Sequence, residues 1–140
     1  MKPSPAEQKQ TILIVEDDRA VLELLIRALS HKGYITMEAE RGSQAMQILS
    51  EIRPDLVILD LKLPDCNGIQ MLRQLKSMDN TIQVIILTGY GSKETARSAM
   101  EIGVFDFLTK PVELHEFYAV VQKALASESP VIMKDNHYAR

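Results

Sequence analysis

The sequence has few of the features that mark secreted, membrane-bound or nucleic-acid-binding chains. It holds a single cysteine, Cys66, so an internal disulfide is impossible and a reducing cytoplasmic compartment is expected. No apolar run approaches the roughly 20 residues that a membrane-spanning helix needs. The basic residues are scattered and the formal net charge is −3, which argues against direct binding of nucleic acid by this domain.

Histidine is also scarce, and the three residues His31, His115 and His137 lie too far apart in the pattern to suggest a transition-metal site. Residues 1–10 are polar and proline-bearing, without the apolar stretch of a signal peptide, and predict a disordered lead-in. The whole chain is 46% hydrophobic and 25% charged, as in a globular protein. We expect one domain at 11–126, followed at 127–140 by a free tail or a truncated linker.

Five segments read as β-strands. The runs 12–15, 56–59 and 84–87 are continuously apolar and rich in β-branched residues, which is typical of strands buried on both faces. Residues 34–40 alternate between apolar and polar, and the run 105–108 is interrupted by a charge. These two patterns predict half-covered strands at the edges of a sheet.

Helical patterns fill the gaps between the strands. Five apolar stripes at helical spacing are formed by Val21, Leu24, Leu25, Ala28 and Leu29; by Ala45, Ile48, Leu49 and Ile52; by Ile69, Leu72 and Leu75; by Ala96, Ala99 and Met100; and by Leu114, Phe117, Val121 and Leu125. We expect the second helix to be entered through Ser43 and the fourth to stop at Gly103. Five strands alternating with five helices predict an α/β fold, a doubly wound parallel sheet with helices on both faces.

Chemically active residues follow the strands at the points where ligands bind in such sheets. The first strand is followed by Glu16, Asp17 and Asp18, the third by Asp60, the fourth by Thr88 and the fifth by Lys110. Carboxylates that meet at one edge repel each other, and a hard divalent cation such as Mg²⁺ relieves that repulsion while leaving room for phosphate oxygens. The set therefore suits phosphoryl transfer to a carboxylate, with the lysine and the threonine hydroxyl assisting.

Each of these residues also has an ordinary structural interpretation. Asp18 is well placed to cap a helix, and Asp60 could simply form a turn. Thr88 could cap the fourth helix, and Lys110 could be a solvated surface lysine. The arrival of complementary groups at one edge from four strands favours a functional site over four unrelated surface residues.

Four motifs carry a family resemblance. They are Ile12-Leu13-Ile14-Val15-Glu16-Asp17-Asp18, Asp60-Leu61-Lys62-Leu63-Pro64-Asp65-Cys66-Asn67-Gly68, Leu87-Thr88-Gly89-Tyr90-Gly91-Ser92 and Asp106-Phe107-Leu108-Thr109-Lys110-Pro111. In this order and at these spacings the sequence resembles the receiver domains of two-component response regulators, from about residue 11 to 125. The resemblance implies a flavodoxin-like (βα)5 fold with strand order 2-1-3-4-5.

The resemblance also implies a role for each site residue. Asp60 is expected to be the phosphoacceptor, and Lys110 is expected to pair with the phosphoryl group. Asp17 is the expected direct ligand of Mg²⁺ or Mn²⁺, together with Asp60, Glu16 and the backbone carbonyl of Lys62. Thr88 is expected to hydrogen-bond the phosphoryl group, and the peptide bond before Pro111 is expected to be cis.

In receivers the threonine acts together with an aromatic switch residue, which is Phe107 here. Phosphorylation would draw both inward and remodel the surface of the fourth helix, fifth strand and fifth helix. Phe107 lacks the hydroxyl of the commoner tyrosine, and it could instead be a plain edge-strand aromatic. We further hypothesise that Lys62 and Tyr90 hinder attack by water and so set the lifetime of the phosphate.

The expected activity is that of a signalling switch, which catalyses only its own phosphorylation and dephosphorylation. Its expected partners are a sensor histidine kinase or phosphotransfer protein, an output domain or effector of unknown kind, and possibly a second copy through the surface defined above. Three alternatives stay open: a phosphatase with an aspartyl-phosphate intermediate, a flavin-binding flavodoxin-like protein, and a receiver that acts without phosphorylation. The first usually has Asp-x-Asp after the first strand, and the acidic loop here would repel a flavin phosphate.

Overall fold

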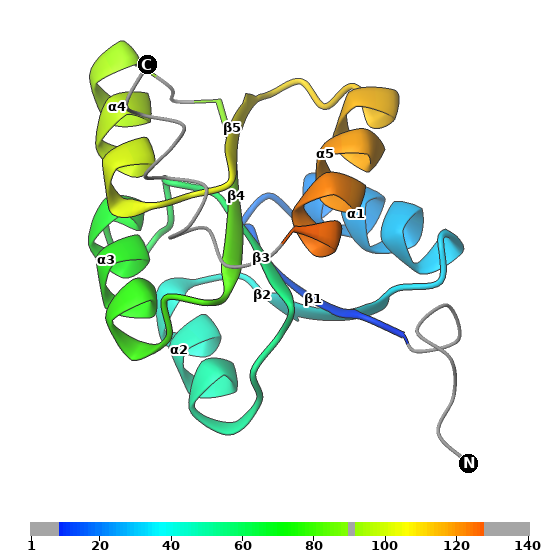
Figure 1. The fold of residues 1–140 in the computed structure, drawn as a ribbon, viewed down its shortest axis with the longest axis horizontal. Coiled ribbons are helices and arrows are strands. Elements are labelled where there is room, and N and C mark those ends of the chain that lie inside the picture. The colour runs from blue at the N-terminus through cyan, green and yellow to red at the C-terminus, as the bar shows by residue number, and fades with distance from the viewer. Residues whose placement is uncertain (1–8, 90–91, 128–140) are drawn as a thin grey trace.

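Strands and helices alternate five times along the chain, as predicted. The computed structural model describes residues 9–89 and 92–127 (Figure 1). The elements are β1 (Thr11–Val15), α1 (Arg19–His31), β2 (Ile35–Ala39), α2 (Gly42–Glu51), β3 (Leu56–Leu59), α3 (Gly68–Met78), β4 (Gln83–Thr88), α4 (Lys93–Ile102), β5 (Asp106–Thr109) and α5 (Leu114–Ala126).

The five strands form one parallel sheet in the order β2-β1-β3-β4-β5. All residues of β3 and β4 are buried, as are four of the five in β1, because helices cover both faces of these central strands. The edge strands β2 and β5 are mostly half-buried or exposed. The predicted fold, strand order and division into central and edge strands are therefore confirmed.

Two helical layers enclose the sheet (Figure 1), with α1 and α5 on one face and α2, α3 and α4 on the other. Alternate residues of each central strand point to opposite layers. In β1, Ile12 and Ile14 join the core with Phe117 of α5, whereas Leu13 and Val15 join the core with Leu72 of α3. Each fully buried aliphatic or aromatic side chain contributes roughly 1.5–3 kcal/mol, so the two layers hold the strand ends in fixed positions.

Side chains at the helix ends agree in part with the sequence analysis. Asp18 is the N-cap of α1 and accepts hydrogen bonds from the Ala20 and Val21 N–H groups, which confirms its structural role. Gly103 ends α4 in the left-handed conformation (φ 119°) that favours glycine. Ser92, not Thr88, caps α4, so the interpretation of Thr88 as that cap is wrong.

Three local expectations are wrong. Leu24 is 44% exposed because it lies about 100° around the helix from the buried Leu25. Leu22, which the predicted stripe left out, is buried. Ile52 is 48% exposed because the chain turns to an extended conformation there and leaves the helix. Helix α2 is not entered through Ser43, which lies inside it; the N-cap position is Arg41, whose side chain makes no capping hydrogen bond.

Some predictions fall on parts of the chain that the structure does not describe. Tyr90, residues 1–8 of the expected lead-in and residues 128–140 of the expected tail lie outside the described residues. The boundaries at 1–10, 11–126 and 127–140 therefore stay predictions. Among the described residues, no helix is both long enough and apolar enough to cross a membrane.

Candidate functional site

A pocket lies at the carboxyl edge of the sheet, where the predicted acidic residues meet. It is lined by Glu16, Asp17, Asp18, Asp60, Lys62, Leu63, Pro64 and Lys110. These residues follow β1, β3 and β5, whose ends the parallel sheet brings to one edge. The predicted convergence of Glu16, Asp17, Asp60 and Lys110 is thus what the structure has.

Three carboxylates form a tight cluster in this pocket. Oxygen atoms of Glu16, Asp17 and Asp60 all lie within 4.8 Å of one another. Glu16 is 2% exposed and Asp60 4% exposed, whereas Asp17 is exposed. Burial raises the pKa of Glu16 to about 7, even though hydrogen bonds from Lys110 and the Asp18 N–H favour its charged form.

Lys110 neutralises part of the buried charge. Its Nζ lies 2.6 Å from Oε1 of Glu16 and 3.0 Å from Oδ2 of Asp60, so one ammonium bridges two carboxylates. Burial by itself lowers the pKa of Lys110, but the hydrogen bonds to Glu16 and Asp60 outweigh it and raise the pKa above its ordinary value. The interpretation of Lys110 as a solvated surface lysine is therefore wrong. The Lys110–Pro111 peptide bond is cis, as predicted.

The loop after β3 holds Asp60 from the other side. The Lys62 N–H donates to Oδ1 of Asp60 at 3.1 Å, and the Asp60 N–H donates to the Val15 carbonyl at 3.0 Å. Lys62 pairs with Asn67 across the loop, and the Gly68 N–H donates to the Leu61 carbonyl. A Cβ at Gly68 would lie 2.4 Å from Leu61 Cα, so only glycine fits this close approach.

The two predicted switch residues, Thr88 and Phe107, do not line the pocket. Thr88 ends β4, is fully buried, and its carbonyl accepts a hydrogen bond from the Lys110 N–H at 3.0 Å. Phe107 is half-buried and lies opposite Ile86 in the β4–β5 register, where Thr88 lies opposite Thr109. Because side chains alternate along a strand, Thr88 and Phe107 point to the same face of the sheet. Tyr90 lies outside the described residues.

The sequence patterns did not point to Asp65, which lies in the loop between β3 and α3. Its carboxylate accepts hydrogen bonds from the N–H groups of Gly42 at 2.7 Å and Ser43 at 3.0 Å. The N–H groups of Ser43 and Gly42 hold the pKa of the Asp65 carboxyl below its usual value. No sequence signal pointed to this contact, because Ser43, the expected start of the second helix, could itself have served as the cap.

The donor set fits a hard divalent cation. All candidate ligands are oxygen atoms, and the arrangement includes neither thiolate nor imidazole, which softer metals prefer. Although Lys110 bridges two of them, three carboxyl groups with oxygen atoms within 4.8 Å of one another concentrate negative charge at this edge. A cation such as Mg²⁺ or Mn²⁺ would relieve that repulsion.

Comparison with known families agrees with this geometry. The family model described as "Response regulator receiver domain" matches residues 12–122. The chain belongs to the receiver-domain family. It is thus a domain of two-component response regulators, and the family resemblance found in the motifs is confirmed.

The chain is similar to proteins of two different lengths. The chain is 38% identical to Sporulation initiation phosphotransferase F of Bacillus subtilis over 86% of its own length and 97% of that protein. It is 36% identical to Regulatory protein AtoC of Escherichia coli over 84% of its length but only 26% of AtoC. The receiver therefore corresponds to nearly all of the first relative and to about a quarter of the second.

Solved structures show the same receiver fold. A CheY-like response regulator receiver domain from Methanospirillum hungatei superposes with a TM-score of 0.82 at 26% identity, covering 84% of this chain and 94% of that one. The receiver domain of a putative Luxo repressor protein from Vibrio parahaemolyticus superposes with a TM-score of 0.80 at 32% identity, covering 84% and 91%.

Proposed function

We propose that this receiver stores a phosphoryl group on Asp60 and passes the signal on by remodelling the surface of α4, β5 and α5. The observation that carries the proposal is the Lys110 bridge between Glu16 and Asp60 inside a cluster of three carboxylates. A structural salt bridge needs one carboxylate and no pocket. The Lys110 bridge instead joins two buried carboxylates beside a third, in a pocket where a ligand can bind.

The placement of the groups supports the following reaction. A carboxylate oxygen of Asp60 attacks phosphorus in a phosphohistidine of a histidine kinase or phosphotransfer protein. The new P–O bond forms as the P–N bond breaks. The electron pair of the broken bond stays on the ring nitrogen, which takes up a proton from solvent as the imidazole leaves. Lys110, already against Asp60 Oδ2, donates to the phosphoryl oxygens, and the Thr88 hydroxyl donates to them in the phosphorylated state. The receiver thus catalyses its own phosphorylation and acts on no other substrate.

The metal would be held by Asp17, Asp60 and the Lys62 carbonyl, with Glu16 beside them. When bound, Mg²⁺ or Mn²⁺ supplies positive charge that neutralises the carboxylates and the incoming phosphoryl oxygens. The Lys62 backbone already contacts Asp60 through its N–H group, so its carbonyl belongs to the same short turn.

Signal output is proposed to pass through Thr88 and Phe107. Their shared face of the sheet is the one covered by α4, and Phe107 packs against the core that includes Ala99 and Met100 of that helix. Movement of Thr88 toward the phosphoryl group leaves space that the Phe107 ring can fill. Because phenylalanine has no hydroxyl, packing alone would report the state.

The relatives support two kinds of context for this switch. Coverage of 97% of Sporulation initiation phosphotransferase F favours a step in a phosphorelay, whereas the relation to AtoC favours a receiver joined to an output domain. A homodimer through α4, β5 and α5 would suit the second. The single cysteine favours a reducing, cytoplasmic setting for either.

The proposal is tested by incubating the protein with Mg²⁺ and a small acyl phosphate and measuring its intact mass. We expect one added phosphoryl group in the wild type and in Asp55→Asn, and none in Asp60→Asn. Asp55 is the matched control because it precedes β3 whereas Asp60 follows it. An equal adduct in Asp60→Asn would overturn the assignment, and no adduct in the wild type would favour a receiver that acts without phosphorylation.

A further inference from the structure

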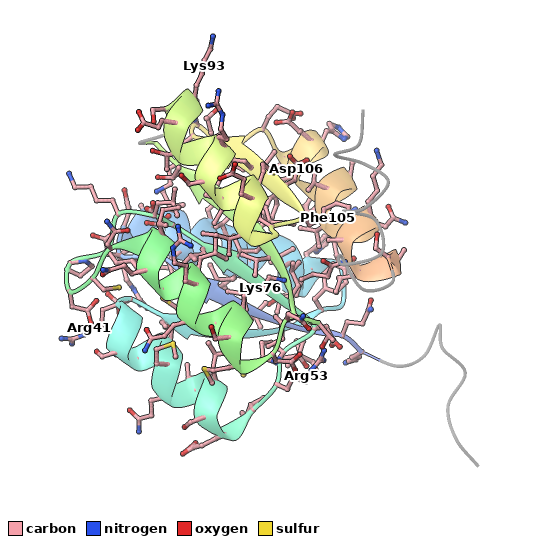
Figure 2. The ribbon with its side chains drawn as sticks, turned by 60° about the vertical axis from the view of Figure 1, so that its left-hand side comes forward. Arg41, Arg53, Lys76, Lys93, Phe105 and Asp106 are labelled. Carbon is pink, nitrogen blue, oxygen red and sulfur yellow. The ribbon has the colours of Figure 1, made fainter. Side chains whose placement is uncertain are left out.

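The loop that carries the site is tied to a helix that contributes nothing to the pocket lining. Asp65 lies in this loop, and its carboxylate caps the N-terminus of α2 through the N–H groups of Gly42 and Ser43. Figure 2 labels Arg41, which stands at the start of α2 and provides no side-chain cap of its own. The capping function that α2 lacks locally is therefore supplied from the loop between β3 and α3.

A second contact reinforces this connection. A Cβ placed at Gly42 would lie 2.4 Å from Sγ of Cys66, so the loop packs directly against the first residue of α2. Two consecutive loop residues, Asp65 and Cys66, thus touch α2, one by hydrogen bonds and the other by close packing.

The other end of the same loop is also fixed. Asn67 caps α3 by accepting hydrogen bonds from the Ile69 and Gln70 N–H groups, and it pairs with Lys62 across the loop. The loop is therefore held between the N-termini of α2 and α3. Its backbone at Lys62 in turn donates to Oδ1 of Asp60.

We infer that Asp65 is a positioning residue for the acidic site, which sets the Lys62 backbone and the Asp60 carboxylate for metal binding by anchoring their loop to α2. The inference rests on the proposed function of the site. Asp65 does not line the pocket, so it acts through the loop and not on the metal or the phosphoryl group. Mg²⁺ accepts little departure from octahedral geometry, so small displacements of a ligand carbonyl weaken its binding.

The test compares metal binding in Asp65→Ala, Asp65→Asn and Asp79→Ala. Mn²⁺ titrations followed by the electron paramagnetic resonance of the free ion report binding without any phosphorylation. We expect the Kd for Mn²⁺ to rise roughly threefold to tenfold in Asp65→Ala, below the ~10–100-fold typical of losing a direct partner of a ligand. The Kd for Mn²⁺ should rise less in Asp65→Asn, since one amide oxygen replaces two carboxylate oxygens as acceptor.

Asp79→Ala is the matched control, because Asp79 also accepts backbone and side-chain hydrogen bonds but lies outside the pocket lining. Its Kd should stay within about twofold of the wild type, whatever stability it loses. In parallel, the Mg²⁺ concentration for half-maximal phosphorylation should rise in Asp65→Ala more than the maximal rate falls.

An unchanged Kd in folded Asp65→Ala would overturn the inference, as would an equal rise in Asp79→Ala. If Asp65→Ala does not fold, Asp65→Asn decides: a Kd equal to that of the wild type contradicts the positioning role. Failure of the proposed function looks different, since the wild type would then bind Mn²⁺ yet acquire no phosphoryl group.

Discussion

Backbone N–H groups and one ammonium hold the two buried carboxylates of the site. Glu16 accepts from the Asp18 N–H at 3.0 Å, Asp60 accepts from the Lys62 N–H, and Lys110 lies between the two acids. Each carboxylate is therefore oriented before a ligand arrives, and reorganisation costs little when one does. This orientation depends on individual residues of the loop after β3.

Gly68→Ala tests how tightly that loop must pack. The added Cβ would meet Leu61 Cα, O and C at 2.4, 2.6 and 2.8 Å, and these are backbone atoms that cannot turn away. We expect a loss of about 1–3 kcal/mol in the free energy of unfolding, as for overpacked sites, measured by urea denaturation. Gly89→Ala is the control, because nothing lies within 4 Å of its Cβ. Equal stability of the two variants would contradict the close packing.

Lys62→Asn tests the proposed role of Lys62 in phosphate lifetime. Lys62 lines the pocket, and its ammonium can pair with phosphoryl oxygens and hinder approaching water. We expect the dephosphorylation rate to rise severalfold, followed as loss of the adduct by intact mass or by phosphate release. Lys76→Asn, outside that lining, should leave the rate unchanged. A rate that does not rise in Lys62→Asn would refute this role.

At the scale of whole elements, helix ends are held by residues from other parts of the chain. Asp79 at the C-cap of α3 accepts hydrogen bonds from the Thr81 N–H at 2.9 Å and from Arg53 Nε at 2.6 Å. Arg53 also contacts the Thr81 hydroxyl. The segment after α2 is thereby joined to the turn before β4, at the edge of the sheet opposite to the acidic site.

Asp79→Asn should remove a pH-dependent part of the stability. Hydrogen bonds from Thr81 and then Arg53 lower the pKa of Asp79 from 3.8 to about 2. A depressed pKa stabilises the folded state above the unfolded value, and this stabilisation is lost as pH falls from about 4 to about 2. Because the side chain is 30% exposed, we expect a loss on the order of 1 kcal/mol at neutral pH.

The measurement is urea denaturation of the wild type and Asp79→Asn across that acid range. The difference between them should shrink as pH falls toward about 2, where half of the wild-type carboxylate is itself protonated. A difference that stays constant from neutral to acid pH would mean that the Asp79 charge contributes nothing.

At the scale of the whole molecule, repulsion between carboxylates destabilises the fold at the edge that holds the candidate site. Two buried carboxylates and an exposed third converge there, because a parallel sheet brings the ends of β1 and β3 together. Elsewhere the described interior is mainly apolar, with Gln83 and Thr88 as its other buried polar residues, and the sheet splits it into two cores. Cation binding at this edge should therefore stabilise the entire fold.

Addition of Mg²⁺ should accordingly raise the melting temperature. At ten times the Kd, binding to the folded state contributes about 1.4 kcal/mol, which corresponds to a rise of roughly 3–6 °C for a domain of this size. Differential scanning fluorimetry or calorimetry measures the shift. Asp17→Asn should lose most of it while Asp79→Asn keeps it, and an equal shift in both would place the cation elsewhere.

The sequence by itself determined the elements and the edge at which the candidate site lies. Continuous apolar runs such as 12–15 predicted central strands, and the alternation at 34–40 predicted an edge strand. These predictions were possible because a strand buried on both faces is apolar throughout, whereas a strand buried on one face alternates. Once the strands were known to be parallel, the positions of Glu16, Asp17, Asp60 and Lys110 followed from their place after each strand.

The tertiary structure alone decided which groups touch one another. The Lys110 bridge, the burial that raises the pKa of Glu16 to about 7, and the cap that Asp65 provides for α2 all join residues distant in sequence. Periodicity alone did not fix which side of α1 is buried, so the predicted stripe included the exposed Leu24 and left out the buried Leu22. Local patterns record burial and conformational preference, whereas a contact such as Asp65 with Gly42 depends on how the loop between β3 and α3 meets the start of α2 after the sheet has formed.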